Sequence, residues 1–504
     1  MSNDSPTGPS HSAPVLPRRD FLKVAGAGAG LLMLGGTAAL AESPAVPGLR
    51  PKRRIPFISS SPDIIVIGAG AWGGWTAYHL RQMGAKVTVV DAYGPGNAHS
   101  TSGDESRGVR SSYGDRDPDK QELWMLWARE AMKRWRAFDD EWGRDMRLNL
   151  FHTTGDLMFR QDWEPYLINT KKWWDKHNIP YQVLHPADVA KEFPVIGMGD
   201  INVVMYEPDA GVVRARRGCQ AVSAAFERLG GHVIIGRVQL PLKNSNGKLR
   251  EITLDTGQTL RADTFVIAPG PWLGKTFPEI FENKMRTPLG YVCYFGTPMN
   301  DERFTYPNIP SFNFPGVTGW AALPVDSRGF RVRGGERAPG ARPGQGQAAA
   351  QGKGPRANGG AAPGNRPPQP PTPPAQLDPD TSDRWANEQQ IEGPRRFVAH
   401  RFPLLANAPI LQTHSCHYEI SASRNFIVTW HPRISNLLIA GGGNAEGFKF
   451  GPVMGEYIAQ RAMGDEGDPA FAKGFGIPEH DFQPGSNGFG GGGGQRDTTR
   501  RGRG

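Results

Sequence analysis

Cysteine is scarce in this sequence, with three residues among 504, at positions 219, 293 and 416. Three thiols cannot build a disulfide framework for a chain of this length, even in an oxidising compartment. Cys219 lies in a segment with helical spacing and Cys293 in an apolar, strand-like segment, so we predict that both are core residues. Cys416 needs another explanation, because THSCHYEI (413–420) places it between two histidines.

Further soft metal ligands are also lacking around Cys416. Successive side chains of a strand point to opposite faces, so His414, Cys416 and Tyr418 would share one face while His417 points away. A structural zinc ion needs about four ligands, and the sequence contains no second cluster of cysteine and histidine. We therefore predict no metal site, which leaves Cys416 as either a buried thiol or a functional group.

No long uninterrupted apolar run is present either. The apolar stretch within LPRRDFLKVAGAGAGLLMLGGTAALAES (16–43) is short and rich in glycine, so we predict no stable membrane span, with a weak anchor as the alternative. Charged, apolar and small-residue regions follow one another in signal-peptide order, and Arg18 and Arg19 resemble a twin-arginine export signal. We predict a signal peptide over 1–41 and a linker over 42–61.

Export of this type has consequences for location and chemistry. The signal predicts recognition by the twin-arginine export machinery and a periplasmic or secreted location. Because that machinery moves proteins that have already folded around a cofactor, the signal favours a redox enzyme.

Negative charge is in slight deficit, with 49 acidic against 58 basic residues and a formal net charge of +9. Much of the basic excess lies in flanking stretches, PKRR (51–54) and RDTTRRGRG (496–504). The part of the chain that would fold is less basic, so nucleic acid is not an expected partner.

Glycine and proline are abundant but unevenly distributed, with 65 and 45 residues. The segments 337–380 and 466–504 carry much of this excess and have no apolar periodicity. Such segments cannot bury enough apolar surface to offset the entropy of ordering them. We therefore predict a disordered insertion over 337–380 and a disordered tail over 466–504.

The first strongly apolar strand leads into a glycine-rich turn. DIIVIGAGAWGGWTAYHLRQMGAKVTVVDAYG (63–94) contains Gly68, Gly70 and Gly73 in G-x-G-x-x-G spacing, followed by a helix and a second strand that ends at Asp91. This spacing suits a tight turn, close approach of a pyrophosphate and close helix–strand packing, and the acid can bind a ribose hydroxyl. The complete strand–turn–helix–strand–acid order predicts a dinucleotide site.

The segment after the second strand indicates which dinucleotide. SGDESRGVRSSYG (102–114) resembles the motif of the sarcosine oxidase and N-methyl amino acid oxidase branch of the D-amino acid oxidase-like flavoproteins. The resemblance implies FAD as cofactor. It also implies that Ser106 and Arg107 lie at the cofactor, with Arg107 near the flavin ring.

The resemblance continues along the chain to about residue 465. It covers YEPDAGVVRARRGCQAV (206–222), HVIIGRV (232–238), TLRADTFVIAPGPW (259–272) and NLLIAGGGNAEGFKFGPVMGE (436–456). By resemblance these segments bring four further positions to FAD, which are Val238, Gly270, Gly443 and Gly447. Lys449 of the last segment is implied in both cofactor and substrate binding.

The same resemblance assigns a role to Cys416. Relatives carry C-x-Y in the strand before the C-terminal flavin loop, with the cysteine bonded to the flavin 8α-methyl carbon and the tyrosine facing the substrate. Here Cys416 and Tyr418 match those positions. The resemblance therefore implies covalent FAD attachment through Cys416.

Two cations are implied in substrate binding. In the family, the arginine matching Arg110 and the lysine matching Lys449 hold the substrate carboxylate over the flavin, which removes a hydride equivalent from the carbon beside the amine. The product is an imine that water hydrolyses. We thus expect an amino acid-like substrate, namely a secondary or N-methylated amino acid.

One departure from the family concerns the electron acceptor. Where relatives carry a lysine that promotes oxygen reduction, this chain has Arg331, with Arg333 as a second possible match, and the family's active-site tyrosine falls near Ala321. Arginine is permanently charged and cannot relay a proton. Both oxygen and a respiratory electron acceptor stay open, and an FAD-dependent amino or hydroxy acid dehydrogenase is the alternative to an oxidase. A non-catalytic flavin-binding scaffold is less favoured, because it has no use for Arg110 and Lys449.

The implied fold class is α/β, with a Rossmann-like FAD-binding domain interleaved with an α+β substrate domain built on a mixed sheet. We predict FAD-binding segments over 62–145, 200–275 and 405–465, and substrate-domain segments over 146–199 and 276–404. The helical stretch 121–142 has tryptophans at helical spacing, which predicts core packing.

Overall fold

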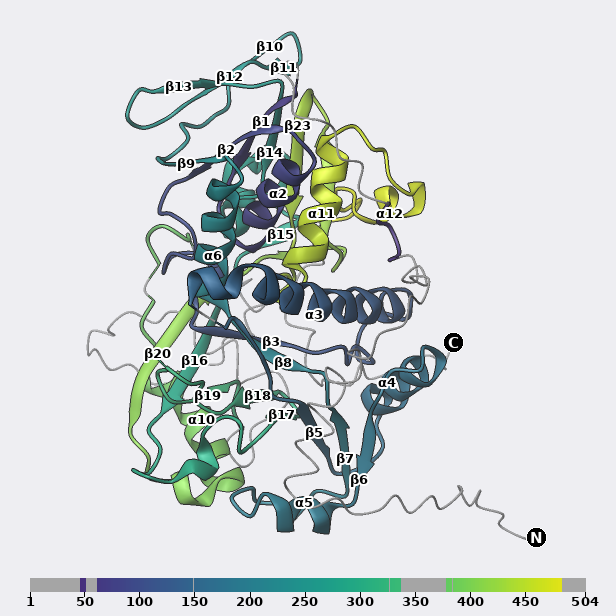
Figure 1. Ribbon diagram of the computed structural model, residues 1–504, viewed down its shortest axis with the longest axis vertical. Helices are drawn as coiled ribbons and strands as arrows, with labels where there is room; N and C mark the ends of the chain where they lie inside the picture. Colours follow the sequence, from purple (N-terminus) through teal and green to yellow (C-terminus); the bar gives the residue numbers. More distant parts are fainter. Residues whose placement is uncertain are drawn as a thin grey trace, which may run out of the picture.

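The computed structural model describes residues 46–50, 61–147, 149–325, 327–336, 378–382 and 384–482. The predicted signal peptide therefore lies outside the described residues, as do most of the insertion and the end of the tail. Two large sheets lie at opposite ends of the molecule, and the long helix α3 (Pro118–Met146) crosses between them (Figure 1).

The upper sheet of Figure 1 is the predicted Rossmann-like sheet. Its strand order is β22 (Ile427–His431), β23 (Ile434–Gly441), β14 (Thr264–Ile267), β1 (Asp63–Ile67), β2 (Lys86–Asp91) and β9 (His232–Ile235). All neighbours pair in parallel except β22 with β23. The strands are rich in valine, isoleucine and leucine because both faces are covered.

Helices cover one face of this sheet, and small strands and short helices cover the other. The helices α2 (Ala71–Gln82), α6 (Ala215–Arg228) and α11 (Gly451–Ala462) pack together on the first face. The opposite face buries Leu273 of α7 (Leu273–Thr276), Phe281 of α8 (Pro278–Phe281) and Phe277 between these helices. The small sheet of β12 (Glu251–Thr253) and β13 (Thr259–Arg261) packs there as well.

The lower sheet is mixed, as predicted for the substrate domain. Its order is β20 (Ile410–His417), β16 (Leu289–Phe295), β19 (Phe330–Arg333), β18 (Val317–Trp320), β17 (Ser311–Phe314), β5 (Asp156–Arg160), β7 (Val203–Glu207) and β6 (Gln182–Leu184). Only β17 and β5 pair in parallel.

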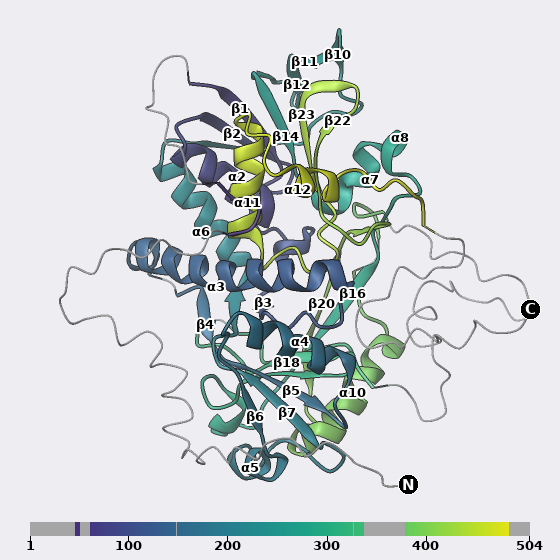
Figure 2. The same cartoon turned by 90° about the vertical axis from the view of Figure 1, so that its right-hand side faces the viewer.

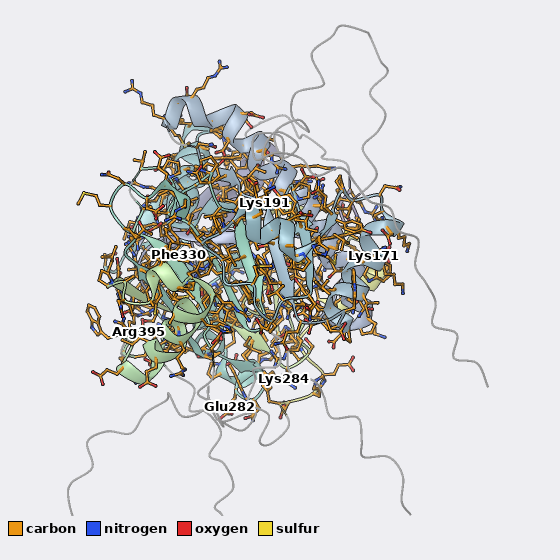
Figure 3. All side chains as sticks on the ribbon, turned by 90° about the horizontal axis from the view of Figure 1, so that it is seen from below. Lys171, Lys191, Glu282, Lys284, Phe330 and Arg395 are labelled. Carbon is orange, nitrogen blue, oxygen red and sulfur yellow. The ribbon has the colours of Figure 1, made fainter. Side chains whose placement is uncertain are left out.

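The two faces of the lower sheet differ in chemistry. One face carries phenylalanines, among them Phe312 and Phe330, which pack against Phe397 of helix α10 (Glu388–Arg401) and its neighbours. Figure 3 labels Phe330 of this core and the exposed Arg395 on the outside of α10. Because side chains alternate along a strand, the polar residues between the phenylalanines face the other way, toward α3 and the upper sheet.

A three-stranded sheet lies between the two large ones. It consists of β3 (Ser106–Val109), β8 (Gly211–Arg214) and β4 (Phe151–Thr153), and it lies under α3 in both ribbon views (Figures 1 and 2). Trp124, Trp127 and Trp135 of α3 are buried, so the predicted core role of this helix is confirmed.

The remaining elements are short and lie around the large sheets. They are η1 (Thr101–Gly103), α4 (Pro165–Lys176), α5 (Pro186–Glu192), β10 (Asn244–Ser245), β11 (Lys248–Leu249), η2 (Gly270–Trp272), β15 (Met285–Arg286), η3 (Glu302–Phe304), η4 (Pro403–Leu405), β21 (Ile420–Ser421) and α12 (Pro469–Gly474). Among all the described residues, no helix has the length and apolarity needed to cross a membrane.

The structure differs from the predicted domain division at two points. The FAD-binding segments 200–275 and 405–465 were predicted from motifs that lie in their middle, yet each begins with a strand of the lower sheet, β7 and β20 respectively. β7 pairs with β5 over five positions and β20 with β16 over seven. The chain therefore crosses between the domains after β7 and after β20, later than predicted.

The predicted disorder also extends too far into the folded chain. At the end of the 337–380 insertion, Asp380 accepts hydrogen bonds from Tyr93 (2.8 Å), Trp272 (3.0 Å) and Lys275 (2.7 Å). In the predicted 466–504 tail, Phe475 of the described part is buried against Tyr457. A few specific contacts hold these residues, which average composition does not register.

The linker predicted over 42–61 is also partly fixed. The Pro47 carbonyl accepts a hydrogen bond from Trp127 Nε1 at 2.9 Å, and the neighbouring Leu49 packs against the core beneath α2, α3 and α11. The described start of the chain is thereby held against α3.

Candidate active site

The glycine turn between β1 and α2 is shaped by close backbone contacts. Gly68 has a φ of +109°, and a Cβ there would lie 2.3 Å from the Ala268 carbonyl oxygen. A Cβ on Gly73 would lie 1.9 Å from the Gly68 oxygen. Both positions require glycine for packing, as the motif predicts.

Gly70 and Gly270 differ, because they face open space. A Cβ on Gly70 would contact only Ser102 Oγ, at 3.4 Å, and one on Gly270 would meet nothing within 4 Å. Gly70 is the N-cap of α2, so the unpaired N–H groups and positive dipole end of a 12-residue helix face this space. That environment suits a pyrophosphate.

The hydroxyl of Ser102 belongs to the same turn, although the sequence analysis did not single it out. Its Oγ accepts a hydrogen bond from the Ala71 amide at 3.1 Å. Ser102 was visible in the quoted motif, but its proximity to the first turn of α2 depends on a tertiary contact.

Asp91, at the end of β2, lies at the predicted ribose site. Its carboxylate accepts from the amides of Ala69 (2.7 Å), Tyr93 (2.9 Å) and Gly94 (2.8 Å). Burial raises its pKa against these hydrogen bonds. β9 pairs beside Asp91, and Val238 follows β9 in an isolated bridge with Leu254.

The C-terminal loop approaches the same region. Gly443 donates its amide to Glu419 Oε2 at 3.1 Å, and the Gly447 carbonyl accepts from Trp72 Nε1 at 2.8 Å. A Cβ on Gly447 would lie 3.0 Å from the Gly443 Cα. The two glycines therefore allow a tight turn against α2.

These residues fit FAD. The α2 N-terminus with Gly68, Gly70 and Gly73 would hold the pyrophosphate, and Asp91 would hold a ribose. Buried polar atoms without a partner among the described residues include Glu419 Oε1, beside the C-terminal loop, and Nε and Nη1 of Arg331, beside Asp104.

The carboxylate of Asp104 is the centre of the polar network between the domains. It is fully buried and pairs with Arg107, with Arg331 Nη2 (2.9 Å) and with the Tyr294 hydroxyl (2.6 Å). Burial would raise the pKa of Asp104, but the two guanidiniums outweigh burial and hold it far below its usual range. Asp104 is thus an ionised carboxylate shared by two cations.

Cys416 lies directly beside this network. Arg107 Nη2 donates to Cys416 Sγ at 3.2 Å and to the Thr101 carbonyl at 2.8 Å. Arg107 therefore holds the sulfur by a hydrogen bond from a permanently charged group. His417 points the opposite way and contacts Thr287, so the predicted alternation of side chains is confirmed.

Tyr418 follows β20 and contacts the lower sheet. A Cβ on Gly290, the strand partner of Cys416, would lie 2.9 Å from the Tyr418 ring, so the ring covers the same side of the strand pair as the Cys416 sulfur. Burial raises the pKa of Tyr418 to about 12, although the nearby Arg333 opposes the shift. Tyr418 is therefore a neutral hydroxyl at neutral pH.

Arg331 and Arg333 both lie on the polar face of β19, Arg331 beside Asp104 and Arg333 beside the Tyr418 ring. Arg331 is 2% exposed, and its guanidinium stacks 4.1 Å from the centre of the Trp320 ring. Trp320 in turn donates to the Ser106 hydroxyl at 2.9 Å. Ser106, expected at the cofactor, therefore orients Trp320 in this structure.

A second buried cluster surrounds Lys449. Its ammonium pairs with Glu446 and donates to the Tyr113 hydroxyl at 2.9 Å, while Arg116 bonds the same Glu446 at 2.7 Å. Burial lowers the pKa of Lys449 to about 8, with contributions from Arg110 and Arg116 and opposition from Glu446. Burial would raise the pKa of Glu446, but Lys449, Arg116 and Arg110 hold it below its usual range.

The predicted pair of substrate-binding cations is brought together at this cluster. Arg110 and Lys449 both interact electrostatically with Glu446, although Arg110 directly follows β3 and Lys449 lies in the loop before α11. No hydrogen bond or ion pair from Arg110 occurs among the described residues, so its guanidinium is available to an anion. Sequence analysis missed Glu446 and Asp104 because acids inside a motif give no sign of which cation they face.

Among the described residues, no group of three or more histidine, cysteine or acidic side chains could hold a metal ion.

A parallel sheet with a glycine turn, facing a mixed sheet across a cation-lined buried site, defines a two-domain flavin-dependent oxidoreductase. A family model confirms this class: residues 63–461 match FAD dependent oxidoreductase. The chain belongs to this family, which confirms the predicted FAD cofactor and enzyme class.

Among similar proteins are two kinds of sarcosine oxidase. Monomeric sarcosine oxidase of Bacillus sp. (strain NS-129) is 22% identical over 424 residues, which cover 80% of this chain and 94% of that protein. Human peroxisomal sarcosine oxidase is 24% identical over 402 residues, covering 80% and 92%. The predicted branch of the family is thereby confirmed.

Solved structures share the fold. Fructosamine oxidase from Aspergillus fumigatus (Amadoriase II) matches with a TM-score of 0.63 and 20% identity, covering 81% of this chain and 88% of its own. Iminodiacetate oxidase from Chelativorans sp. BNC1 matches with a TM-score of 0.62 and 17% identity, covering 82% and 100%. The predicted fold class is confirmed.

The Asp104 network generates a stability prediction. Asp104→Asn keeps the shape but leaves Arg107 and Arg331 without their shared counterion, and breaking a buried pair typically costs about 3–5 kcal/mol. Urea unfolding at neutral pH should show a loss of that order. Glu251→Gln is the control, because Glu251 pairs with the exposed Arg261 at 3.0 Å, and its loss should stay below about 1 kcal/mol. Equal losses in the two variants would contradict the role given to Asp104.

Proposed function

We propose that this protein is an exported enzyme that oxidises the C–N bond of a secondary or N-methylated amino acid to an imine. The observation that carries the proposal is that Arg110 and Lys449, from separate parts of the FAD-binding fold, are both buried close enough to Glu446 to lower its pKa. The names of similar proteins support it, since monomeric and peroxisomal sarcosine oxidases and N-methyl-L-tryptophan oxidase of Yersinia pestis (strain Pestoides F) are among them.

Binding of the substrate carboxylate follows from the charges of the pocket. Arg110 offers a planar, permanently charged guanidinium, and Lys449 offers an ammonium held in place by Tyr113 and Glu446. Glu446 balances part of the positive charge while the pocket is empty of substrate. A carboxylate between Arg110 and Lys449 would be paired on both sides, as a buried anion requires.

Orientation of the reacting carbon is the second task of the site. A carboxylate fixed at two points leaves the rest of the substrate little rotational freedom, and such positioning accounts for a large part of enzymatic rate enhancement. When bound, FAD supplies the redox chemistry by accepting the two electrons released as the C–N bond becomes an imine. Tyr418, neutral and buried, can line the substrate side of the site.

Covalent attachment of FAD through Cys416 is part of the proposal. Arg107 supports it, because its guanidinium lies 3.2 Å from Sγ and is held in place by Asp104. The new bond would join Sγ to the flavin 8α-methyl carbon. Two electrons and two protons leave the S–H and C–H groups, and the electrons pass to the acceptor used in turnover.

The attachment makes a direct prediction. Unaltered holoprotein should retain its yellow colour in the pellet after acid precipitation, whereas Cys416→Ser should release FAD into the supernatant. Cys219→Ser is the matched control, because Cys219 is buried in α6 and should leave attachment unchanged. Free flavin released from the unaltered protein would refute covalent attachment.

The identity of the electron acceptor leaves a second candidate function, an FAD-dependent dehydrogenase that uses a respiratory acceptor. Its support is the position of Arg331, whose charge is shared with Asp104 rather than free to meet oxygen. The rate at which air reoxidises the substrate-reduced enzyme in stopped flow separates the two candidates. Reoxidation faster than turnover supports the oxidase, and negligible reoxidation supports the dehydrogenase.

Export rests on the sequence at Arg18 and Arg19, which lies outside the described residues. We expect Arg18→Lys combined with Arg19→Lys to retain the protein in the cytoplasmic fraction of its host, since twin-arginine export depends on the arginine pair. Cell fractionation and immunoblotting measure this. Unchanged export of the double variant would rule out the twin-arginine route.

The carboxylate site predicts a loss that is specific to substrate type. Losing one partner of a buried charge pair costs about 2–5 kcal/mol, so Arg110→Ala should lower kcat/KM for N-methyl amino acids by at least about 30-fold. Amines without a carboxylate should be affected far less. Stopped-flow flavin reduction with both substrate types measures the difference, and equal losses would show that Arg110 does not bind the carboxylate.

The same site predicts a pH dependence. Lys449 is protonated below its pKa of about 8, so carboxylate affinity should fall as the pH rises through 8. Lys449→Arg keeps its charge at alkaline pH and should abolish that fall. A fall that persists in this variant would assign the pH dependence to another group.

A further inference from the structure

A small pocket lies beside Arg110 on the polar face of the lower sheet. It has about 210 Å³ of empty space and is lined by Arg110, Asp156, Ser311, Thr318 and Trp320, among others. This space includes part of the open solvent in front of the pocket. The pocket therefore brings a cation, Arg110, and an acid, Asp156, to one opening on the polar face of the sheet.

Asp156 is the acid of this pocket and lacks a partner there. The residue is 4% exposed, and its Oδ2 atom is buried with no hydrogen-bond partner among the described residues. No ion pair within 4 Å involves Asp156 in the described part of the chain, although Arg110 is its strongest favourable charge. β5 fixes the position of Asp156 between its strand neighbours Ser311 and Glu207.

The neighbouring Glu207 shows what a purely structural buried acid looks like in this sheet. It is also fully buried, but it accepts hydrogen bonds from the amide and hydroxyl of Ser111 and lies 3.6 Å from Arg129. A buried carboxylate without such partners is costly to the fold. The free acceptor of Asp156 can therefore take a hydrogen bond from a ligand in the pocket.

We propose that Asp156 binds a cationic group of the substrate, so that the preferred substrate is an N-substituted amino acid with a second basic group. Arg110 then binds the carboxylate of the ligand, and Asp156 binds its ammonium or guanidinium group. Trp320, whose ring already stacks with Arg331, also lines the pocket and offers an aromatic surface to a cation. This inference rests on the proposed function and deepens it.

The charges around Asp156 make the preference for a cationic substrate depend on pH. Burial raises its pKa to about 7, against the attraction of Arg110, Arg160 and Lys449 and with a contribution from Glu207. Asp156 is ionised above that pH, so the preference for a cation should grow as the pH rises through 7. Carboxylate binding declines above about 8, where Lys449 loses its proton. Basic substrates should therefore bind best between those two values.

Two measurements on the FAD-loaded enzyme test the inference within that window. The first is stopped-flow flavin reduction by Nα-methyl-lysine and by Nα-methyl-2-aminoheptanoate, in which a methyl group replaces the side-chain ammonium. The second is calorimetric binding of ω-amino carboxylates of increasing length against their methyl-ended isosteres, which have no α-amine to oxidise.

In the unaltered enzyme we expect the cationic member of each pair to reduce the flavin faster, or to bind more tightly, by at least about 30-fold. That factor corresponds to the lower end of the free-energy cost of losing one partner of a buried charge pair. Asp156→Asn, which keeps the size of the side chain, should remove the preference and leave the neutral substrate nearly unchanged.

Three outcomes overturn the inference. If both substrates reduce the flavin equally well and Asp156→Asn changes nothing, the inference fails and the proposed function stands. If Asp156→Asn slows both substrates equally, Asp156 positions Arg110 or acts on the reacting amine instead. If no N-methyl amino acid reduces the flavin, the proposed function fails and the inference fails with it.

Discussion

The shared carboxylate of Asp104 is the interaction on which the site depends. It lies just before β3, receives Arg107 from the same strand, and is met from the lower sheet by Arg331 of β19 and Tyr294 of β16. These bonds join the loop that follows β2 to the sheet that carries Cys416. Arg107, which donates to Cys416, is held by Asp104 and by the Thr101 carbonyl, so the geometry at the sulfur depends in part on the same carboxylate.

Charge balance is the wider constraint. Buried cations would be too costly alone, so each cluster contains its own acid: Asp104 for Arg107 and Arg331, and Glu446 for Lys449 and Arg116. Arg110 and Asp156 line one pocket and are each other's strongest favourable charge, yet neither makes a hydrogen bond or a close ion pair among the described residues. Such groups indicate where a ligand can add a partner.

The sequence predicted best what is encoded locally. The positions of Gly68, Gly70, Gly73 and Asp91 follow from one βαβ unit, and the alternation at Cys416 and His417 from a single strand. Asp104 and Asp156 could not be predicted as they are, because their surroundings come from strands far apart in the chain. The ordered ends at Asp380 and Phe475 were missed for the same reason, since composition averages over a window and a few specific contacts decide the outcome.

In the function that we propose, a substrate carboxylate lies between Arg110 and Lys449 beside the flavin. A crystal structure of the FAD-loaded enzyme with an ether analogue, in which oxygen replaces the amine of an N-methyl amino acid and prevents oxidation, tests this most directly. We expect the carboxylate within hydrogen-bond distance of both the Arg110 guanidinium and the Lys449 ammonium. A carboxylate bound elsewhere, with Lys449 still closed on Glu446, would contradict the account.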